Sequence, residues 1–525
     1  MSKGKLILLV LLTSVLLVPP ACKRHNDTFV IALGDNVRTI DPIGSPSVDA
    51  ASERVRTLIF NSLVKKNEKF DYTGELAVDP IQRSDDGLIY TFTLHDGVKF
   101  HDGKTLTSED VKYTLDLVFR SDFAKSASFN EGTGADKHSY IKSVEAPDAK
   151  TIVVTLIKPW VGLLSNLVPV AIIPKDSYES QKTHPLGTGP FRFVRFDNTQ
   201  QVCDLEAFPE YWEGAPKLPA VQVRVISEMN SLQSNLLSGV VDIAPMPTSL
   251  SPDAIKGLEK NPNLQVKVFP GSNLVLLTIN TSSAPLDNVK VRQAIAYAVN
   301  RENMIKNLLL DLGKIAHSIL PEESWAYSTG QTYSYDAEKA KQLLDEAGFR
   351  DPDGDGPKMR FDKPIIFKLS GASVAGRQYA GVIQNDLKAV GIPVEIQTPE
   401  QNTLFDELRR GNFQMAYSQW VGGNQDPIFY KDLFATSEIP TQTRPSRNRS
   451  RYSNPELDKL LDEAVNTFDR TRGRELFVKI QDIVSREVPV LPLWYQSNVV
   501  IAKKNVQNIQ VNASGDWGFV RNLSH

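Results

Sequence analysis

Residue types that carry out catalysis or bind metals are few and scattered along this chain. It has only seven histidines in 525 residues, and no two of them have the spacing of three or four that a helical metal site uses. His95 and His101 lie nearest in sequence, on either side of Asp96-Gly97, and this arrangement is typical of a surface hairpin. The chain has neither a G-x-S-x-G motif nor a phosphate-binding G-x-x-x-x-G-K-[ST] motif. We therefore expect no enzymatic activity, no metal and no cofactor.

One acidic segment matches the spacing of a calcium-binding loop. Asp351-Pro352-Asp353-Gly354-Asp355-Gly356 places carboxylates at positions 1, 3 and 5 and glycine at position 6, and Asp362 falls at position 12. Aspartate at position 12 is shorter than the usual bidentate glutamate, and Lys358 stands where a hydrophobic residue is expected. A turn rich in Asp and Gly is the favoured interpretation, and calcium binding is the alternative.

The segment that most favours ligand binding is Trp420-Val421-Gly422-Gly423-Asn424-Gln425-Asp426-Pro427. It follows residues 413–419, which read as a buried strand. In open α/β sheets, ligands bind in the crevice outside the carboxyl ends of the strands. Glycines there let a ligand approach the backbone closely. We therefore expect this loop to hold a ligand.

The elements that would position this loop interleave strands with helices, which predicts an α/β fold. Thr107 is a suitable helix N-cap with Asp110 three residues later, Asp336 caps a helix that Gly348 ends, and Asn454-Pro455 starts another. Strands are predicted at residues 29–33, 88–94, 151–157, 191–196, 201–205 and 413–419, and further helices at residues 54–64 and 291–298.

Some other notable side chains fit structural roles better than chemical ones. The pairs Tyr211-Trp212 and Trp494-Tyr495 could stack on a ligand, but core or interface packing is commoner for such residues. Cys203 lies in a strand-like run, where a buried and inert thiol is expected.

Length and charge limit the possible classes of protein. A chain of 525 residues exceeds one hydrophobic core and must divide into domains. Its 41% hydrophobic and 23% charged residues are ordinary for a soluble globular protein. The net charge of −3 gives no basic footprint, so we expect no nucleic-acid partner.

The N-terminus reads as an export signal. Lys3 and Lys5 precede an apolar run over residues 6–18, which is too short to span a bilayer. Ala21-Cys22 resembles a bacterial lipoprotein cleavage site, although Pro19 stands where leucine is usual. We expect residues 1–21 to be removed and Cys22 to carry a lipid; an ordinary cleaved signal with Cys22 incidental is the alternative.

A series of short motifs runs in order over nearly the whole mature chain. They are Thr39-Ile40-Asp41-Pro42, residues 85–92, 99–103 and 107–111, Gly187-Thr188-Gly189-Pro190-Phe191, Glu210-Tyr211-Trp212, Val291-Arg292-Gln293-Ala294-Ile295, Ala347-Gly348-Phe349, Asn454-Pro455-Glu456-Leu457-Asp458 and Pro492-Leu493-Trp494. This set resembles the family 5 extracellular solute-binding proteins, the oligopeptide, dipeptide and nickel receptors of ABC importers. No single motif is decisive, but the ordered set is highly specific.

The resemblance implies a two-lobed periplasmic-binding-protein fold of type II-like architecture, with an extra domain inserted in lobe I. The lobes would close on the ligand by hinge motion. Lobe I would comprise residues 22–47, 185–270 and 499–525, the inserted domain residues 48–184, and lobe II residues 271–498.

The resemblance also implies candidate ligand-binding residues. In this family the peptide backbone pairs as an added strand, here with Pro46-Ser47-Val48 and Gln419-Trp420-Val421. Peptide receptors of the family present an aspartate to the ligand's ammonium group at the position of Gly423. Asn424 follows it, and Asp426 is the nearest remaining carboxylate. Asp426 either replaces the missing anchor or has a structural role.

Taken together, these features favour an extracytoplasmic, periplasmic lipoprotein that captures peptides or similar elongated solutes. The dipeptide receptor uses an arginine for the ligand's carboxylate, and Ser370 stands at that position here, with Arg377 seven residues later. We therefore expect oligopeptides rather than dipeptides. A metal chelate, a glycoside or a signalling molecule is the alternative ligand. The expected partners are the permease subunits of an ABC importer in the inner membrane, and we expect the protein to be a monomer, anchored by its lipid.

Overall fold

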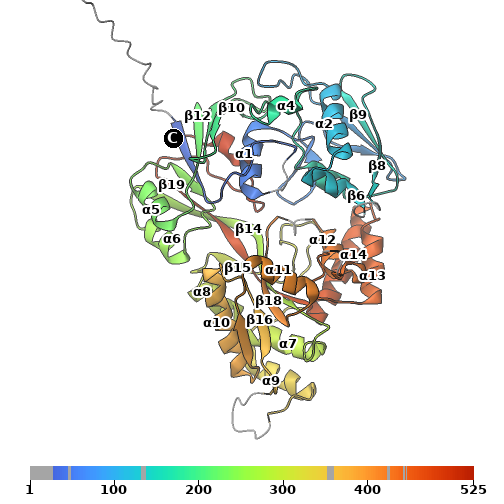
Figure 1. Cartoon of the computed structure of the whole chain (residues 1–525), viewed down its shortest axis with the longest axis vertical. Helices are drawn as coiled ribbons and strands as arrows, with labels where there is room; N and C mark the ends of the chain where they lie inside the picture. Colours follow the sequence, from blue (N-terminus) through green and yellow to red (C-terminus); the bar gives the residue numbers. More distant parts are fainter. Residues whose placement is uncertain are drawn as a thin grey trace, which may run out of the picture.

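The structure of this protein is a computed structural model. Figure 1 shows an upper and a lower half joined by long strands. The structure describes residues 28–44, 49–131, 137–351, 360–422, 426–441, 444 and 446–525.

One mixed sheet runs through both halves of the described chain. Two long antiparallel strands, β14 (Leu264–Ile279) and β19 (Val490–Lys503), connect the halves (Figure 1). Strand β15 (Gly313–Ile315) pairs with β19 beside the main path. Along that path the order is β10 (Phe191–Asp197), β11 (Val202–Ala207), β12 (Ala220–Val225), β1 (Thr28–Leu33), β13 (Ile243–Pro245), β19 (Val490–Lys503), β14 (Leu264–Ile279), β18 (Met415–Trp420), β16 (Ile365–Lys368) and β17 (Val394–Gln397).

The pairing of β14 with β19 breaks where the two halves meet. Residues 264–269 of β14 pair with the end of β19, residues 273–278 pair with its beginning, and the register shifts between them. At this break a Cβ on Gly271 would stand 2.0 Å from the carbonyl oxygen of Gln496. Only glycine allows so close an approach of two backbones. The Asn498 amide secures the break by donating to the Pro270 carbonyl at 3.1 Å.

The upper half also holds smaller strand pairs and short helices. Strands β4 (Gln82–Arg83), β5 (Ile89–Thr93), β9 (Thr151–Leu156) and β8 (Ile141–Glu145) form a second sheet. Two strand pairs accompany it, β2 (Val64–Lys66) with β3 (Tyr72–Gly74), and β6 (Asn130–Glu131) with β7 (His138–Ser139). The helical segments are α1 (Ala50–Ile59), α2 (Ser108–Arg120), η1 (Ala124–Phe129), α3 (Leu163–Leu167), α4 (Tyr178–Gln181), α5 (Met229–Leu237), α6 (Pro252–Glu259) and η5 (Gly518–Asn522).

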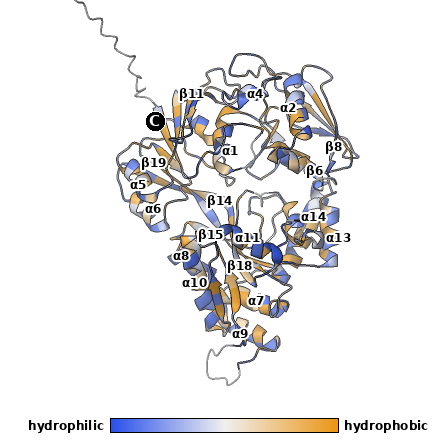
Figure 2. Ribbon diagram, viewed as in Figure 1, coloured by the Kyte–Doolittle hydropathy of each residue, from blue (hydrophilic) through white to orange (hydrophobic). Residues whose placement is uncertain are grey.

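Helices cover the sheet in the lower half. In Figure 2 the helix α11 (Gln401–Arg410) is largely hydrophilic, as expected for a helix with one face to solvent. These helical segments are α7 (Val289–Ala298), α8 (Arg301–Asn307), α9 (Ala337–Glu346), α10 (Val374–Ala389), α11 (Gln401–Arg410), α12 (Phe429–Phe434), η4 (Thr436–Glu438), α13 (Pro455–Ala464) and α14 (Arg470–Glu487).

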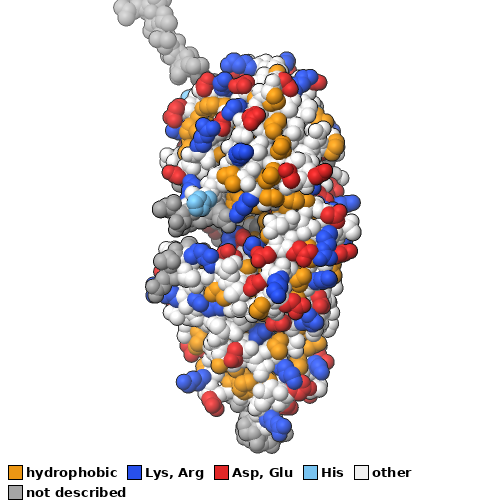
Figure 3. All heavy atoms as spheres, turned by 90° about the vertical axis from the view of Figure 1, so that its right-hand side faces the viewer, with side chains coloured by type: hydrophobic (Ala, Val, Ile, Leu, Met, Phe, Trp, Pro, Cys, Tyr) orange, Lys and Arg blue, Asp and Glu red, His pale blue; other side chains and the backbone are white. Residues whose placement is uncertain are grey.

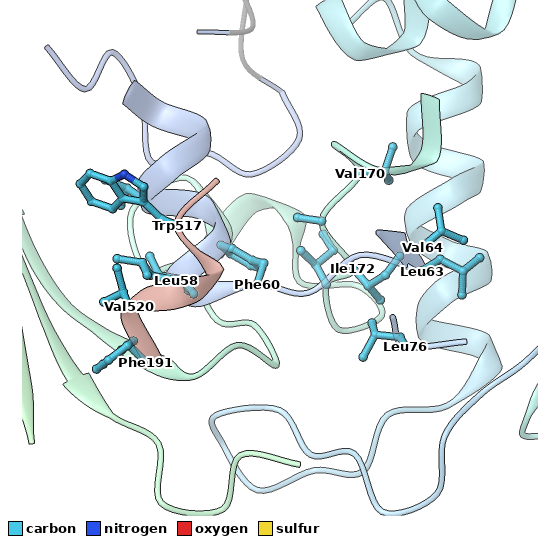
Figure 4. Packing of buried hydrophobic residues seen from close by; sticks show 14 of the residues in the cluster. Leu58, Phe60, Leu63, Val64, Leu76, Val170, Ile172, Phe191, Trp517 and Val520 are labelled. Atoms are coloured by element: carbon cyan, nitrogen blue, oxygen red, sulfur yellow. The ribbon is translucent and has the colours of Figure 1, made fainter. Parts of the chain in front are cut away.

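The core of the upper half brings together segments that are far apart in sequence. Figure 4 shows Trp517 and Val520 from the C-terminal segment close to Leu58 and Phe60 of the α1 region and Phe191 of β10. All five side chains are at most 2% exposed. Burying a large apolar side chain contributes about 1.5–3 kcal/mol, so this contact fixes the C-terminal segment against α1.

Most of the predicted elements are present, with some corrections. The capping residue Asp110 accepts hydrogen bonds from the Thr107 backbone and hydroxyl, both at 2.8 Å, at the start of α2. The predicted helix at residues 54–64 is wrong at both ends. It starts at residue 50, because Asp49 caps it, and stops at residue 59, and Val64 belongs to β2.

The predicted strand at residues 413–419 also shifts. It extends to Trp420, because that residue pairs with Leu274 of β14.

The aromatic pairs are packing residues. Trp494 and Tyr495 are 1% and 4% exposed, and Tyr211 is 5% exposed. Trp212 is half-buried and donates to the Asn61 side chain at 3.2 Å. The stacking alternative for these pairs is therefore not supported by their placement.

The turn that carries His101 is less exposed than a simple surface hairpin. The His101 ring is partly buried, packs edge-on against Phe208 with ring centroids 5.1 Å apart, and contacts the Gly189 carbonyl at 3.0 Å. Burial lowers the pKa of His101 to about 4.

Candidate functional site

The outer half of β18 has an edge that no described strand covers. On one side, β18 pairs with β14 along its whole length, from Met415 to Trp420. On the other side, β16 reaches only Met415 and Ala416. Over the part of the chain that the structure describes, residues 417–420 therefore have no strand partner on that side. Such an edge offers backbone donors and acceptors to an added strand.

The side chains at the end of β18 leave this strand edge accessible to a ligand. Gln419 is exposed and donates to the Tyr417 hydroxyl at 3.0 Å, and Val421 is 64% exposed. Trp420 lies edge-on to Phe429 of α12, with centroids 4.9 Å apart. The indole therefore packs on α12, and no strand among the described residues covers the edge.

The upper and lower halves touch close to this edge. The Tyr72 hydroxyl of β3 donates to Asp426 Oδ2 at 2.6 Å, although 354 residues separate the two in sequence. Beside this bond, Asp71 forms an ion pair with Arg470 at the start of α14. We call the Tyr72–Asp426 hydrogen bond and the Asp71–Arg470 ion pair the interdomain bridge.

A second contact extends the interdomain bridge. The Arg83 guanidinium of β4 lies 4.2 Å from the centroid of the Phe468 ring. A Cβ on Gly87 would stand 2.5 Å from the same ring. Figure 3 shows a hollow at mid-height between the two halves, seen from the right-hand side of Figure 1.

The carboxylate of Asp426 is already engaged by its neighbours. Its Oδ1 accepts the backbone N–H of Ile428 at 3.0 Å, at the start of α12, and its Oδ2 accepts the Tyr72 hydroxyl. Burial lowers the pKa of the Lys66 ammonium, and the negative charges of Asp426 and Asp516 oppose that effect. These contacts favour a structural role for Asp426 over that of a ligand anchor.

The other predicted site residues divide into two groups. Gln419, Trp420, Val421 and Asp426 lie together at the end of β18 and the start of the following segment. Five of the predicted ligand-binding residues lie outside the described residues: Pro46, Ser47, Val48, Gly423 and Asn424. So do Cys22, where a lipid is expected, and most of the acidic segment at residues 351–362, for which calcium binding is the alternative.

Arg377 is the arginine nearest to Ser370, the position where the dipeptide receptor binds the ligand's carboxylate, and it contacts the backbone of the preceding turn. The Arg377 guanidinium donates to the Gly371 carbonyl. Ser370 accepts from the Ala372 N–H at 3.4 Å and so serves a turn.

Sequence reasoning did not identify Tyr72, Lys66 or Arg470. Each acquires its role from a partner hundreds of residues away or on another element, and no local pattern marks them. Among the described residues, no group of three or more His, Cys, Asp or Glu side chains could hold a metal. No described helix has the length and hydrophobicity needed to cross a membrane.

Comparison with known proteins places this architecture in a family. The model of bacterial extracellular solute-binding proteins, family 5 Middle, matches residues 71–441. The oligopeptide-binding protein AppA of Bacillus subtilis is 28% identical over 491 residues, covering 90% of this chain and 87% of AppA. Heme-binding protein A of Haemophilus influenzae is 29% identical over 501 residues, covering 90% and 88%. The chain therefore belongs to the family 5 extracellular solute-binding proteins.

Solved structures agree with this assignment. NikZ of Campylobacter jejuni in complex with Ni(L-His) superposes with a TM-score of 0.74 and 25% identity, covering 95% of this chain and 99% of NikZ. AppA of Bacillus subtilis in complex with a nonapeptide gives a TM-score of 0.70 and 26% identity, covering 94% and 98%. The predicted two-lobed α/β fold is confirmed. Proteins of this family are extracytoplasmic substrate-binding components of ABC importers.

Proposed function

We propose that this protein captures oligopeptides between its two lobes and delivers them intact to the permease subunits of an ABC importer. The single observation that carries the proposal is the edge of β18 beyond Ala416, which no strand of the described residues covers. A peptide backbone can pair with this edge whatever its side chains are. The chain is similar to AppA, whose solved structure holds a nonapeptide.

The proposed closing motion uses the elements already described. The break in β14–β19 pairing around Gly271 is the proposed hinge, which supports the boundaries at 270/271 and 498/499. The interdomain bridge then holds the inserted domain, residues 48–184, against lobe II, residues 271–498. We also propose that Cys22 carries the lipid anchor and that the protein acts as a monomer without turnover of its ligand. Mass spectrometry of the mature N-terminus tests the anchor.

A thermal-shift experiment tests peptide capture. Mixed hexapeptides should raise the melting temperature, because a ligand that binds only the folded state stabilises it. The same peptides carrying N-methyl groups on alternate backbone nitrogens should give a smaller shift, since they lose donors to the β18 edge. Equal shifts from both mixtures would contradict backbone pairing.

A non-peptide solute is the second candidate ligand. The observation that favours it is the absence of a carboxylate at position 423, where peptide receptors of the family hold the ligand's ammonium group. Relatives include a heme-binding protein and a protein solved with Ni(L-His). A melting shift with a nickel–histidine complex, heme or a glycoside, and none with peptides, would favour this candidate.

A further inference from the structure

Arg54 of α1 is a partly buried cation with little to neutralise it. Among the described residues, its guanidinium makes one hydrogen bond, to Met246 Sδ at 3.9 Å, and no carboxylate oxygen lies within ion-pair distance. A guanidinium has five N–H donors and no acceptor. A thioether sulfur is a weak acceptor, so most of the hydrogen-bonding capacity of Arg54 is unused.

The other cation of α1 is neutralised. Arg56, two residues later on α1, donates to Glu53 at 2.5 Å and to the Ser62 hydroxyl at 3.4 Å. Among the described residues, Arg54 therefore differs from Arg56 in having no carboxylate within ion-pair distance.

Arg54 lies near the carboxyl end of strand β13 in the upper half, through its contact with Met246. Met246 directly follows β13, which pairs in parallel with β1 through Ile31 and Ile243. The crevice outside the carboxyl ends of such strands is where α/β sheets bind ligands. Met246 also donates its backbone N–H to the Val499 carbonyl at 2.7 Å, next to the proposed hinge.

The charge of Arg54 is not paired with a nearby carboxylate, so a ligand anion could bind to it. Burial lowers the pKa of Arg54, and the charge of Asp35, just after β1, opposes this effect only from beyond ion-pair distance. Removing a cation partly from water without a nearby opposite charge raises the free energy of the folded protein. A carboxylate in this position would accept two parallel hydrogen bonds, which is the geometry that arginine favours.

We propose that Arg54 binds a carboxylate group of the ligand at the hinge end of the cleft. This inference rests on the proposed function and names the chemical class of its ligand. The carboxylate comes from either the C-terminus or an acidic side chain of a peptide.

Three hexapeptide mixtures distinguish the two sources of the carboxylate. The first has a free C-terminus and no Asp or Glu, the second is the same mixture amidated, and the third is amidated but contains Asp and Glu. A thermal shift with the first mixture alone assigns the C-terminus, and a shift with the third assigns a side chain. A full shift with the second mixture overturns the inference while leaving peptide capture intact.

Variants connect the response to Arg54 itself. Arg54→Gln should weaken binding of the active mixture roughly 10- to 100-fold, and Arg54→Lys should weaken it less. Arg120→Gln removes the same charge from a side chain that is 79% exposed on α2, and binding should be unchanged. Circular dichroism and the ligand-free melting temperature establish that each variant folds.

The remaining outcomes separate the inference from the proposed function. If no peptide mixture stabilises the wild type, peptide capture is contradicted, and glutathione and a nickel–histidine complex become the carboxylate-bearing probes. A probe that stabilises the wild type but not Arg54→Gln then supports the inference alone. Equal stabilisation of both proteins, or no response to any probe, overturns it.

Discussion

Replacing Tyr72 with phenylalanine should weaken ligand binding. The substitution removes the hydroxyl that donates to Asp426 Oδ2 at 2.6 Å across the interdomain bridge and that also hydrogen-bonds with Ser165 of α3 in its own half. A hydrogen bond to a charged group contributes about 1.5–3 kcal/mol. Because water can reach both partners when the halves separate, the lower figure applies, and it is present only in the closed form.

The magnitude follows from that difference. A loss of about 1.4 kcal/mol shifts the equilibrium between closed and open forms roughly tenfold. If tight binding requires closure, the apparent dissociation constant of a hexapeptide mixture should rise by about the same factor. The increase should come mainly from faster dissociation. The ligand-free melting temperature should change little.

Fluorescence titration and stopped-flow dissociation measure these quantities. Tyr335→Phe is the matched control, because Tyr335 is 46% exposed and the structure gives its hydroxyl no partner among the described residues. An unchanged dissociation constant in Tyr72→Phe, or an equal change in the control, would refute the interdomain bridge as a closing contact.

Three further predictions concern stability and reactivity. Lys125→Met should cost about 3–5 kcal/mol in urea unfolding, because the buried ammonium donates to two backbone carbonyls and pairs with a glutamate; Lys104→Met, at a side chain 77% exposed, should cost little. Burial holds the pKa of His101 at about 4, below its ordinary 6.5, so the folded state favours the neutral ring. The free energy of unfolding should therefore be highest above pH 6.5 and should fall by about 3 kcal/mol as the pH falls towards 4. His101→Gln should reduce this dependence on pH, and His184→Gln, at an exposed side chain, should not. Burial raises the pKa of the Cys203 thiol to about 12, so Ellman's reagent should react with it only on unfolding, and rapid reaction in the folded protein would contradict the packing.

Local sequence signals predicted much of the fold because they act over a few residues. Thr107 and Asp110 mark the start of α2 through contacts three residues apart. The helix predicted at 54–64 failed at its end because Asn61 and Ser62 bind Glu75 instead of continuing the helix. Such a contact cannot be read from periodicity.

Only the part of the candidate site that depends on local backbone structure could be predicted from the sequence. The end of β18 follows from a strand followed by glycines, and the structure shows that strand. The bond from Tyr72 to Asp426 and the isolation of Arg54 depend on elements brought together by the fold. A tyrosine and an arginine in ordinary surroundings give no signal of either role.

Equilibrium dialysis against a mixture of peptides two to ten residues long, followed by mass spectrometry, tests the central claim most directly. The protein should retain intact peptides, enriched in oligopeptides over dipeptides and approaching one per chain. Retention of no peptide, or the appearance of shortened peptides, would contradict capture without turnover.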